Sequence, residues 1–240
     1  VNPLLGGART IRALTNVDLA VHKGTTLGLV GESGSGKSTL ARIILGLIEP
    51  SSGSARFHGT DIAEHLSSDS RSYRKSIQMV FQDPASTLNP KFTIYHILAE
   101  PLTIHGIVPA KGTRAKAAEL LKLVELDEDA LDRYPHEFSG GQRQRIGIAR
   151  ALSVSPEVII LDEPVSALDL SIQTQILNLL TALKRTLDLT YLFISHDLNV
   201  IRHMSDAVAV LYLGRVMEYA SADELFSHPA HPYTELLLSR

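Results

Sequence analysis

The 240-residue sequence contains no cysteine and no tryptophan, and aromatic residues make up only 5% of it. Without cysteine, this segment forms no disulfide, no cysteine-ligated zinc site and no cysteine-ligated iron–sulfur cluster. No apolar run approaches the roughly 20 residues that a membrane-spanning helix needs, so contact with a membrane would require other chains. The net charge of −3 disfavours nucleic acid as the main partner, because proteins that bind it usually present a basic face.

Short apolar strands alternate with helical patterns over much of the chain. Strands are predicted over residues 14–29 (with a turn at 22–24), 77–81, 158–161, 190–195 and 207–213. Helices are predicted over residues 37–47, 170–187 and 197–204. Alternation of this kind implies right-handed crossovers and a largely parallel sheet.

One helix-rich stretch, residues 84–153, interrupts the alternation. Helices are predicted within it over residues 93–105, 113–126 and 142–153. We therefore predict one domain over residues 1–240, in which 1–83 and 154–240 form the core and 84–153 is an inserted helical subdomain. A chain of this length can bury such a core.

A glycine-rich string follows the predicted strand that ends at Val30. Its members are Gly31, Glu32, Ser33, Gly34, Ser35, Gly36, Lys37, Ser38 and Thr39. Residues 31–38 fit G-x-x-x-x-G-K-[ST], in which glycines let backbone N–H groups turn onto phosphate oxygens and the next helix points its positive end at the same anion. Lys37 is expected to reach the β- and γ-phosphates and Ser38 to bind Mg²⁺.

A carboxylate pair, Asp162 and Glu163, ends the apolar strand 158–161. The carboxyl ends of the strands are where a doubly wound sheet places its ligands. Asp162 is expected to hold Mg²⁺, partly through water, and Glu163 to polarise the attacking water as general base. Taken alone, the pair fits a solvated strand end equally well, and the phosphate loop favours the functional interpretation.

A second glycine-rich string opens a predicted helix about a hundred residues after the first. It consists of Ser139, Gly140, Gly141 and Gln142. Ser139 can cap the helix, and the N–H groups of the two glycines can face an anion. The string has no obvious task in its own chain's nucleotide site. It makes sense if two copies meet and each covers the other's ATP.

The three strings, in this order, resemble the nucleotide-binding domain of ATP-binding-cassette (ABC) transporters over nearly the whole chain. The resemblance implies an α/β fold: a P-loop NTPase (RecA-like) core with a mostly parallel sheet, a small antiparallel β subdomain and an inserted helical subdomain. It implies an ATPase that uses ATP and Mg²⁺ and dimerises around two ATP. The family usually has Leu where this chain has Phe138, also an apolar residue.

Further site residues follow from the resemblance. Gln82, after the strand 77–81, matches the glutamine that touches Mg²⁺ and the attacking water. His196 matches the histidine that contacts the γ-phosphate, and Asp169 lies in the loop that crosses the dimer interface beside Glu163. A solitary Gln after a strand is usually just solvated, and a solitary His is more often structural. The neighbouring motifs favour the functional interpretation of both.

Residues 82–90, 134–138 and 231–234 resemble the ATPases of dipeptide and oligopeptide importers. The same group includes nickel and glutathione importers, and none of these strings touches the solute. The implied partners are a second nucleotide-binding domain, identical or not, two transmembrane permease subunits and, indirectly, an external solute-binding protein. The implied location is the cytoplasmic side of the cell membrane, as a peripheral subunit.

Two rival classes were weighed. A non-transport ABC ATPase that acts on nucleic acid or the ribosome usually has two cassettes or a long coiled-coil insertion, together with a basic surface. A GTP-binding switch would need an Asn-Lys-x-Asp string, which the sequence lacks. The single cassette and the net charge of −3 favour the transport ATPase.

Two expectations concern details of binding. Cassette ATPases usually stack adenine on an aromatic residue upstream of the phosphate loop, but the first aromatic residue here is Phe57. Either such a residue precedes Val1, or Leu4 or Leu5 replaces it. Residues 84–135 join Gln82 to the Ser139 string, and we expect this stretch to contact the membrane subunits through exposed apolar positions such as Phe92 and Ile97.

Overall fold

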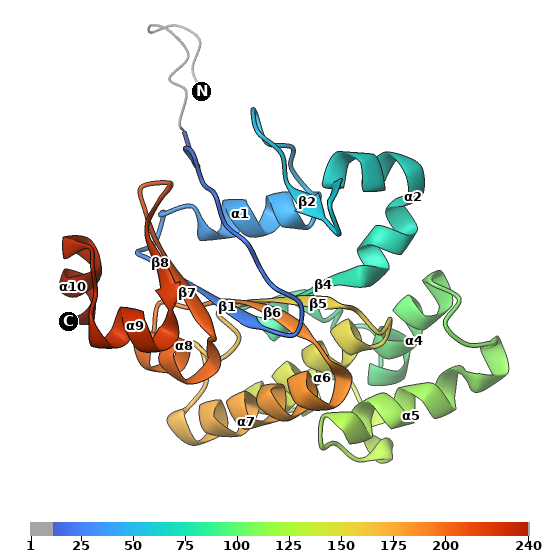
Figure 1. Ribbon diagram of the computed structural model, residues 1–240. Coiled ribbons are helices and arrows are strands. Elements are labelled where there is room, and N and C mark those ends of the chain that lie inside the picture. Colours follow the sequence, from blue (N-terminus) through green and yellow to red (C-terminus); the bar gives the residue numbers. More distant parts are fainter. Residues whose placement is uncertain (1–11, 240) are drawn as a thin grey trace, which may run out of the picture.

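A six-stranded sheet runs through the middle of the computed structural model, which describes residues 12–239 (Figure 1). Its strand order is β4-β5-β6-β1-β7-β8. The first five strands in this order are parallel, and β8 pairs antiparallel with β7. The bounds are β1 Thr26–Val30, β4 Ile77–Val80, β5 Val158–Asp162, β6 Thr190–Ile194, β7 Ala207–Tyr212 and β8 Arg215–Ser221.

The central strands are apolar on both faces because helices cover both. Along β6, Tyr191 and Phe193 belong to one buried cluster, whereas Leu192 and Ile194 belong to the other. Figure 1 shows α1 and α2 on one face of the sheet and α6, α7 and α8 on the other. Their bounds are α1 Lys37–Ile44, α2 Ile62–Ser76, α6 Gly140–Leu152, α7 Leu170–Leu187 and α8 Leu198–Met204.

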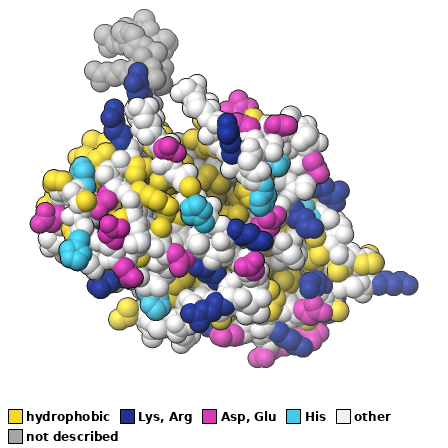
Figure 2. Space-filling view, in the orientation of Figure 1, with side chains coloured by type: hydrophobic (Ala, Val, Ile, Leu, Met, Phe, Trp, Pro, Cys, Tyr) yellow, Lys and Arg dark blue, Asp and Glu magenta, His cyan; other side chains and the backbone are white. Residues whose placement is uncertain are grey.

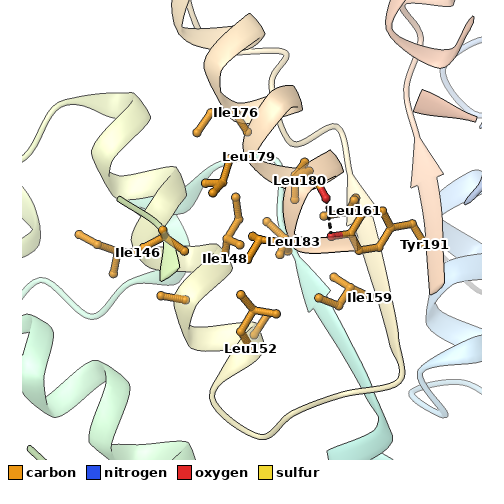
Figure 3. Packing of buried hydrophobic residues seen from close by; sticks show 14 of the residues in the cluster. Ile146, Ile148, Leu152, Ile159, Leu161, Ile176, Leu179, Leu180, Leu183 and Tyr191 are labelled. Carbon is orange, nitrogen blue, oxygen red and sulfur yellow. Dashed lines mark hydrogen bonds between the residues drawn. The ribbon is translucent and has the colours of Figure 1, made fainter. Parts of the chain in front are cut away.

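The stretch predicted to be helical contains α3 Pro84–Thr87, α4 Ile94–Ile104 and α5 Thr113–Leu123 before α6 begins. Its buried side chains form one continuous cluster with α7 and one face of the sheet. Figure 3 shows the contact in which Ile148 and Leu152 of α6 pack beside Leu183 of α7. The helix that begins at the second glycine string is therefore held firmly against the core. The bounds 84–153 for a separate subdomain stay a prediction.

Smaller elements complete the chain. The antiparallel pair β2 Arg56–Phe57 and β3 Thr60–Asp61 precedes α2. After β8 come α9 Ala222–Ser227 and α10 Pro232–Leu238. Three short 3-10 helices also occur among the described residues, namely Ala110–Gly112, Glu128–Asp132 and Pro135–Glu137.

Three expectations need correction. Residues 14–22 form no strand, although the side chains of Leu14, Val17 and Leu19 pack against a buried cluster. An apolar pattern indicates that side chains are buried, but it does not show that the backbone has a neighbouring strand to pair with. Helix α2 and strand β8 were not predicted. Ile97 was expected to be exposed but is buried at 3%, whereas Phe92 is 41% exposed as expected.

The surface carries charges of both signs. On the face in Figure 2, acidic and basic side chains are interspersed. No helix within residues 12–239 combines the length and the apolar character needed to cross a bilayer.

Candidate active site

The phosphate-loop string turns from β1 into α1 in the way its glycines require. Gly31 and Gly36 have φ values of +151° and +110°, in the region that favours glycine. A Cβ at Gly31 would lie 2.1 Å from the carbonyl oxygen of Leu211, so a larger residue would displace this backbone. Helix α1 has no side-chain N-cap, which leaves its first N–H groups available to an anion.

Lys37 lies beneath this loop and is only 8% exposed. Its Nζ donates hydrogen bonds to the carbonyl oxygens of Gly31, at 2.7 Å, and Glu32, at 2.9 Å. Burial lowers the pKa of Lys37, while the carboxylates of Glu163 and Asp162 raise it. The lysine is thus positioned beside both carboxylates and the loop that is predicted to bind phosphate.

Asp162 and Glu163 leave the sheet at the carboxyl end of β5. Burial raises the pKa of Asp162, as does the neighbouring Glu163 carboxylate, and the cations Lys37 and Arg42 lower it. Glu163 has the left-handed φ of 47°, and its N–H donates to the Ile194 carbonyl at 2.9 Å. A non-glycine residue in this conformation is strained, which is common where a side chain must be aimed for function.

Gln82 and His196 hold the two carboxylate oxygens of Glu163. Gln82 Nε2 donates to Glu163 Oε2 at 2.9 Å, and His196 Nδ1 lies 3.1 Å from Oε1. Ser166 adds a further contact, since its Oγ donates to the Glu163 carbonyl at 3.1 Å and lies 3.4 Å from Gln82 Nε2. Gln82, Glu163 and His196 are distant in sequence. They meet because they follow the carboxyl ends of the neighbouring strands β4, β5 and β6.

His196 is set in place by the residues on either side. Ser195 Oγ accepts a hydrogen bond from the Asp197 N–H at 3.0 Å. Asp197 in turn caps α8, because its Oδ1 accepts from the N–H of Asn199 at 2.8 Å. The cap fixes the backbone of the turn and leaves the His196 side chain, 62% exposed, free to face the cleft.

Much of the phosphate loop lines one cleft of about 790 Å³, together with the carboxylate pair, Gln82 and His196. Of the predicted site residues it includes Ser33, Gly34, Gly36, Lys37, Ser38, Thr39, Gln82, Asp162, Glu163 and His196. Three lining residues were missed from the sequence: Arg12, Ala13 and Leu213. Leu213 belongs to the two-residue turn between β7 and β8. The only available signal was the Leu-Gly dipeptide, a weak indicator of such a turn.

The second glycine string lies outside this cleft. Ser139 and Gln142 form a capping box, in which Ser139 Oγ accepts from the Gln142 N–H at 3.3 Å and Gln142 Oε1 accepts from the Ser139 N–H at 3.0 Å. A Cβ at Gly141 would lie 2.4 Å from Ile172 Cγ2, so glycine permits the close packing of α6 on α7. Asp169 precedes α7 and is also absent from the cleft lining.

The cleft suits a nucleoside triphosphate with Mg²⁺. It offers uncapped N–H groups, the Lys37 ammonium, the Ser38 hydroxyl and the Asp162 carboxylate. Residues 12–239 contain no group of three or more His, Cys, Asp or Glu side chains suited to a metal ion. In nucleotide sites Mg²⁺ is usually bound by one or two protein side chains together with phosphate oxygens.

Residues 14–166 match the family model described as ABC transporter. The chain belongs to this family, and it is an ATPase built on the P-loop NTPase fold. Among solved structures, cbiO1 of Clostridium perfringens, part of the ABC transporter complex cbiONQ, is similar with a TM-score of 0.80. The identity is 30%, over 90% of this chain and 84% of that one.

A second solved structure is the ATP-binding cassette MJ0796, a dimer in a post-hydrolysis state bound to ADP and phosphate. Its TM-score is 0.79, with 33% identity over 91% of this chain and 94% of that one. Among curated proteins, the oligopeptide transport ATP-binding protein AppF of Bacillus subtilis (strain 168) is 53% identical, over 95% of this chain and 70% of its own length. OppF of Streptococcus mutans, which has the same description, is 49% identical over 98% and 76%.

Asp162→Asn is expected to stabilise the nucleotide-free protein at neutral pH. Because the pKa of Asp162 is raised, the ionised carboxylate destabilises the folded state, by about 1.4 kcal/mol for each pKa unit. This destabilisation of the folded state is fully present above the raised pKa, and it disappears below the ordinary pKa of 3.8. Thermal unfolding at about pH 7.5 and about pH 5 should show a gain in Tm that shrinks at the lower pH.

Asp206→Asn is the control of opposite sign. Burial alone would raise the pKa of Asp206, but hydrogen bonds from Lys184 and the Thr26 N–H lower it. Its ionised form therefore stabilises the fold, and the amide should lower the Tm at neutral pH. A Tm gain for Asp162→Asn that is the same at both pH values would contradict the electrostatic explanation.

The 240-residue chain is expected to discriminate poorly between ATP and GTP. No described residue lining the cleft is aromatic, and Leu4 and Leu5 lie outside the described residues. Stacking of a base on an aromatic ring contributes about 1–3 kcal/mol, or about 5- to 150-fold in affinity. Calorimetric titration should give Kd values within a few-fold for the two nucleotides. A strong preference for ATP would show that another base platform exists.

Proposed function

We propose that this chain is the ATP-hydrolysing subunit of a peptide importer, and that two such chains enclose two ATP. The observation that carries the two-chain arrangement is the separation of the two glycine strings. The first lines the cleft with Glu163, and the second lies outside it with its N–H groups at the start of α6. Peptide import is supported by similarity to AppF and OppF, which are described as oligopeptide transport proteins.

Nucleotide binding is assigned to the phosphate loop. The N–H groups that open α1, together with Lys37, bind the β- and γ-phosphates. Ser38, Asp162 and Gln82 would hold Mg²⁺, which would supply positive charge to neutralise the phosphates. The buried position of Lys37 favours this role, because a cation with few water contacts interacts strongly with a phosphate anion.

Hydrolysis is assigned to Glu163, Gln82 and His196. Glu163 accepts a proton from the attacking water while the water oxygen bonds to the γ-phosphorus. The bond from that phosphorus to the bridging oxygen breaks, and ADP keeps this oxygen. The contacts from Gln82 and His196 orient the Glu163 carboxylate. His196 is also assigned to donate to the γ-phosphate.

The partner chain supplies the rest of the site. Ser139, Gly140 and Gly141 of each chain face the ATP held by the other chain, with Gln142 keeping Ser139 in place through the capping box. Asp169 crosses between the chains beside Glu163. Hydrolysis therefore needs two chains, and each chain contributes to both sites.

Transport requires further partners. Two transmembrane permease subunits contact this chain on the cytoplasmic side of the membrane, and a solute-binding protein delivers the peptide from outside. The exposed apolar side chains near Gln82 and in the helical stretch suit contact with a permease, namely Phe81, Phe92 and Ile104. The permease and the binding protein select the solute.

Glu163→Gln is expected to bind ATP and to hydrolyse it about 10²–10⁴-fold more slowly, because the positioned base is lost. The variant should accumulate as a dimer with ATP between its chains. Steady-state phosphate release and size-exclusion chromatography with and without ATP measure the two effects. Glu157→Gln is the matched control, since Glu157 lies before the opposite end of the same strand and contacts His58. Near-normal turnover by Glu163→Gln would remove Glu163 from its assigned role.

Phe92→Ser is expected to reduce ATP-driven uptake in the assembled importer while basal hydrolysis is kept. The exposed ring lies in the helical stretch and outside the cleft. Uptake into vesicles and phosphate release should be measured together. Leu236→Ser is the control, because Leu236 is 52% exposed on the C-terminal helix α10. Equal uptake by the two variants and the parent would place the permease contact elsewhere.

A further inference from the structure

Arg150 connects the helix of the second glycine string to the segment that follows Gln82. It lies near the C-terminal end of α6, and its Nη1 donates to the carbonyl oxygen of Thr87 at 2.8 Å. Thr87 ends α3, five positions after Gln82. The bond therefore joins two segments that are 63 residues apart in sequence, each of which carries a group predicted to face ATP.

The environment of Arg150 makes this bond strong. Burial lowers the pKa of Arg150, and the nearby Glu100 carboxylate raises it. A guanidinium stays charged in proteins, and hydrogen bonds from a charged donor are stronger than neutral ones. Because Arg150 is half-buried, water competes less for its guanidinium than it would for that of an exposed arginine, and the Thr87 carbonyl accepts one of its hydrogen bonds.

The segment after Gln82 is a small, self-bonded turn. The Ser86 hydroxyl donates to the Asp83 carbonyl at 2.9 Å, and the Leu88 N–H donates to the Pro84 carbonyl at 3.0 Å. The Leu88 side chain is 1% exposed. Because these bonds tie the turn together, we expect the group that holds Thr87 also to influence the position of Gln82 relative to Glu163.

We propose that Arg150 is a positioning residue that links the motion of α6 to Gln82. Ser139 caps the other end of this helix, and Figure 3 shows the helix packed against α7 and β5. A shift of the Ser139 end, which faces the partner's ATP, is transmitted through Arg150 and Thr87 to Gln82, which faces the chain's own ATP. This inference rests on the proposed function, and it makes Arg150 a link between the two ATP sites of the dimer.

Arg145 provides a matched control on the same helix. Its Nη1 donates to the Val124 carbonyl at 2.9 Å and to Glu125 Oε2 at 2.6 Å. Its side chain is 11% exposed. It therefore also ties α6 to a backbone carbonyl, but the tie is to the end of α5 and does not reach the Gln82 segment.

The test measures hydrolysis as a function of ATP and of Mg²⁺ for Arg150→Met, Arg150→Lys and Arg145→Met, each with and without Gln82→Ala. Arg150→Met should lower kcat by about 10- to 100-fold, as loss of a group that orients a catalytic ligand typically does. It should also raise the Mg²⁺ concentration needed and lower the Hill coefficient for ATP. With Gln82→Ala already present, Arg150→Met should cause no further loss, because the two residues act on the same step.

Arg145→Met should lower the Tm about as much as Arg150→Met does. It should leave kcat, the Mg²⁺ requirement and the Hill coefficient near those of the parent. If Arg150→Met fails to fold, Arg150→Lys keeps the charge and one donor group, and a smaller change in the same direction supports the proposal. An Arg150 effect that adds fully to Gln82→Ala, or that Arg145→Met reproduces, overturns it. If Gln82→Ala alone has no effect, the proposed role of Gln82 fails and this inference fails with it.

Discussion

The parallel register of β5, β6 and β1 is the constraint on which the rest of the site depends. The N–H of Glu163 donates to the Ile194 carbonyl at 2.9 Å, and the N–H of Ser195 donates to the Leu29 carbonyl at 3.3 Å. These bonds continue the ladder just beyond the strand ends. They bring the phosphate loop, the carboxylate pair and His196 to one edge, as strands that run in the same direction must. The buried ammonium of Lys37 offsets part of the negative charge that the two carboxylates bring to this edge.

The helical stretch is tied to this edge of the sheet through helix α6, which contacts the turn after Gln82. Helix α6 is anchored by apolar packing on α7 and β5, by Arg145 to the end of α5 and by Arg150 to the turn after Gln82. Its N-terminal string is outside its own cleft. In the proposed two-chain arrangement, this helix has one end at the partner's ATP and the other end tied to its own site, which suits it to synchronise two hydrolysis events.

Much of the fold was predictable because the buried strands and the long amphipathic helices have strong periodicities. Helix α7 was predicted with its observed ends, and the turn at 22–24 is present, with Thr25 N–H donating to the His22 carbonyl. The failures had a different cause. Residues 14–22 contain apolar side chains that are partly buried, but their backbone pairs with no strand among the described residues. Ile97 looked like a surface residue and is buried, because helix packing decides which side of an apolar helix is covered.

The sequence by itself was sufficient to predict the chemistry of the site. The spacing of Gly31, Gly36 and Lys37 is sufficient to predict a phosphate-binding turn, because glycine conformation and helix polarity are local properties. Only the tertiary structure decided the rest: that Gln82 bonds to Glu163 across 81 residues, and that Leu213 lines the cleft. Such contacts depend on which strands are neighbours and how helices pack, and no local pattern in the chain encodes these distances.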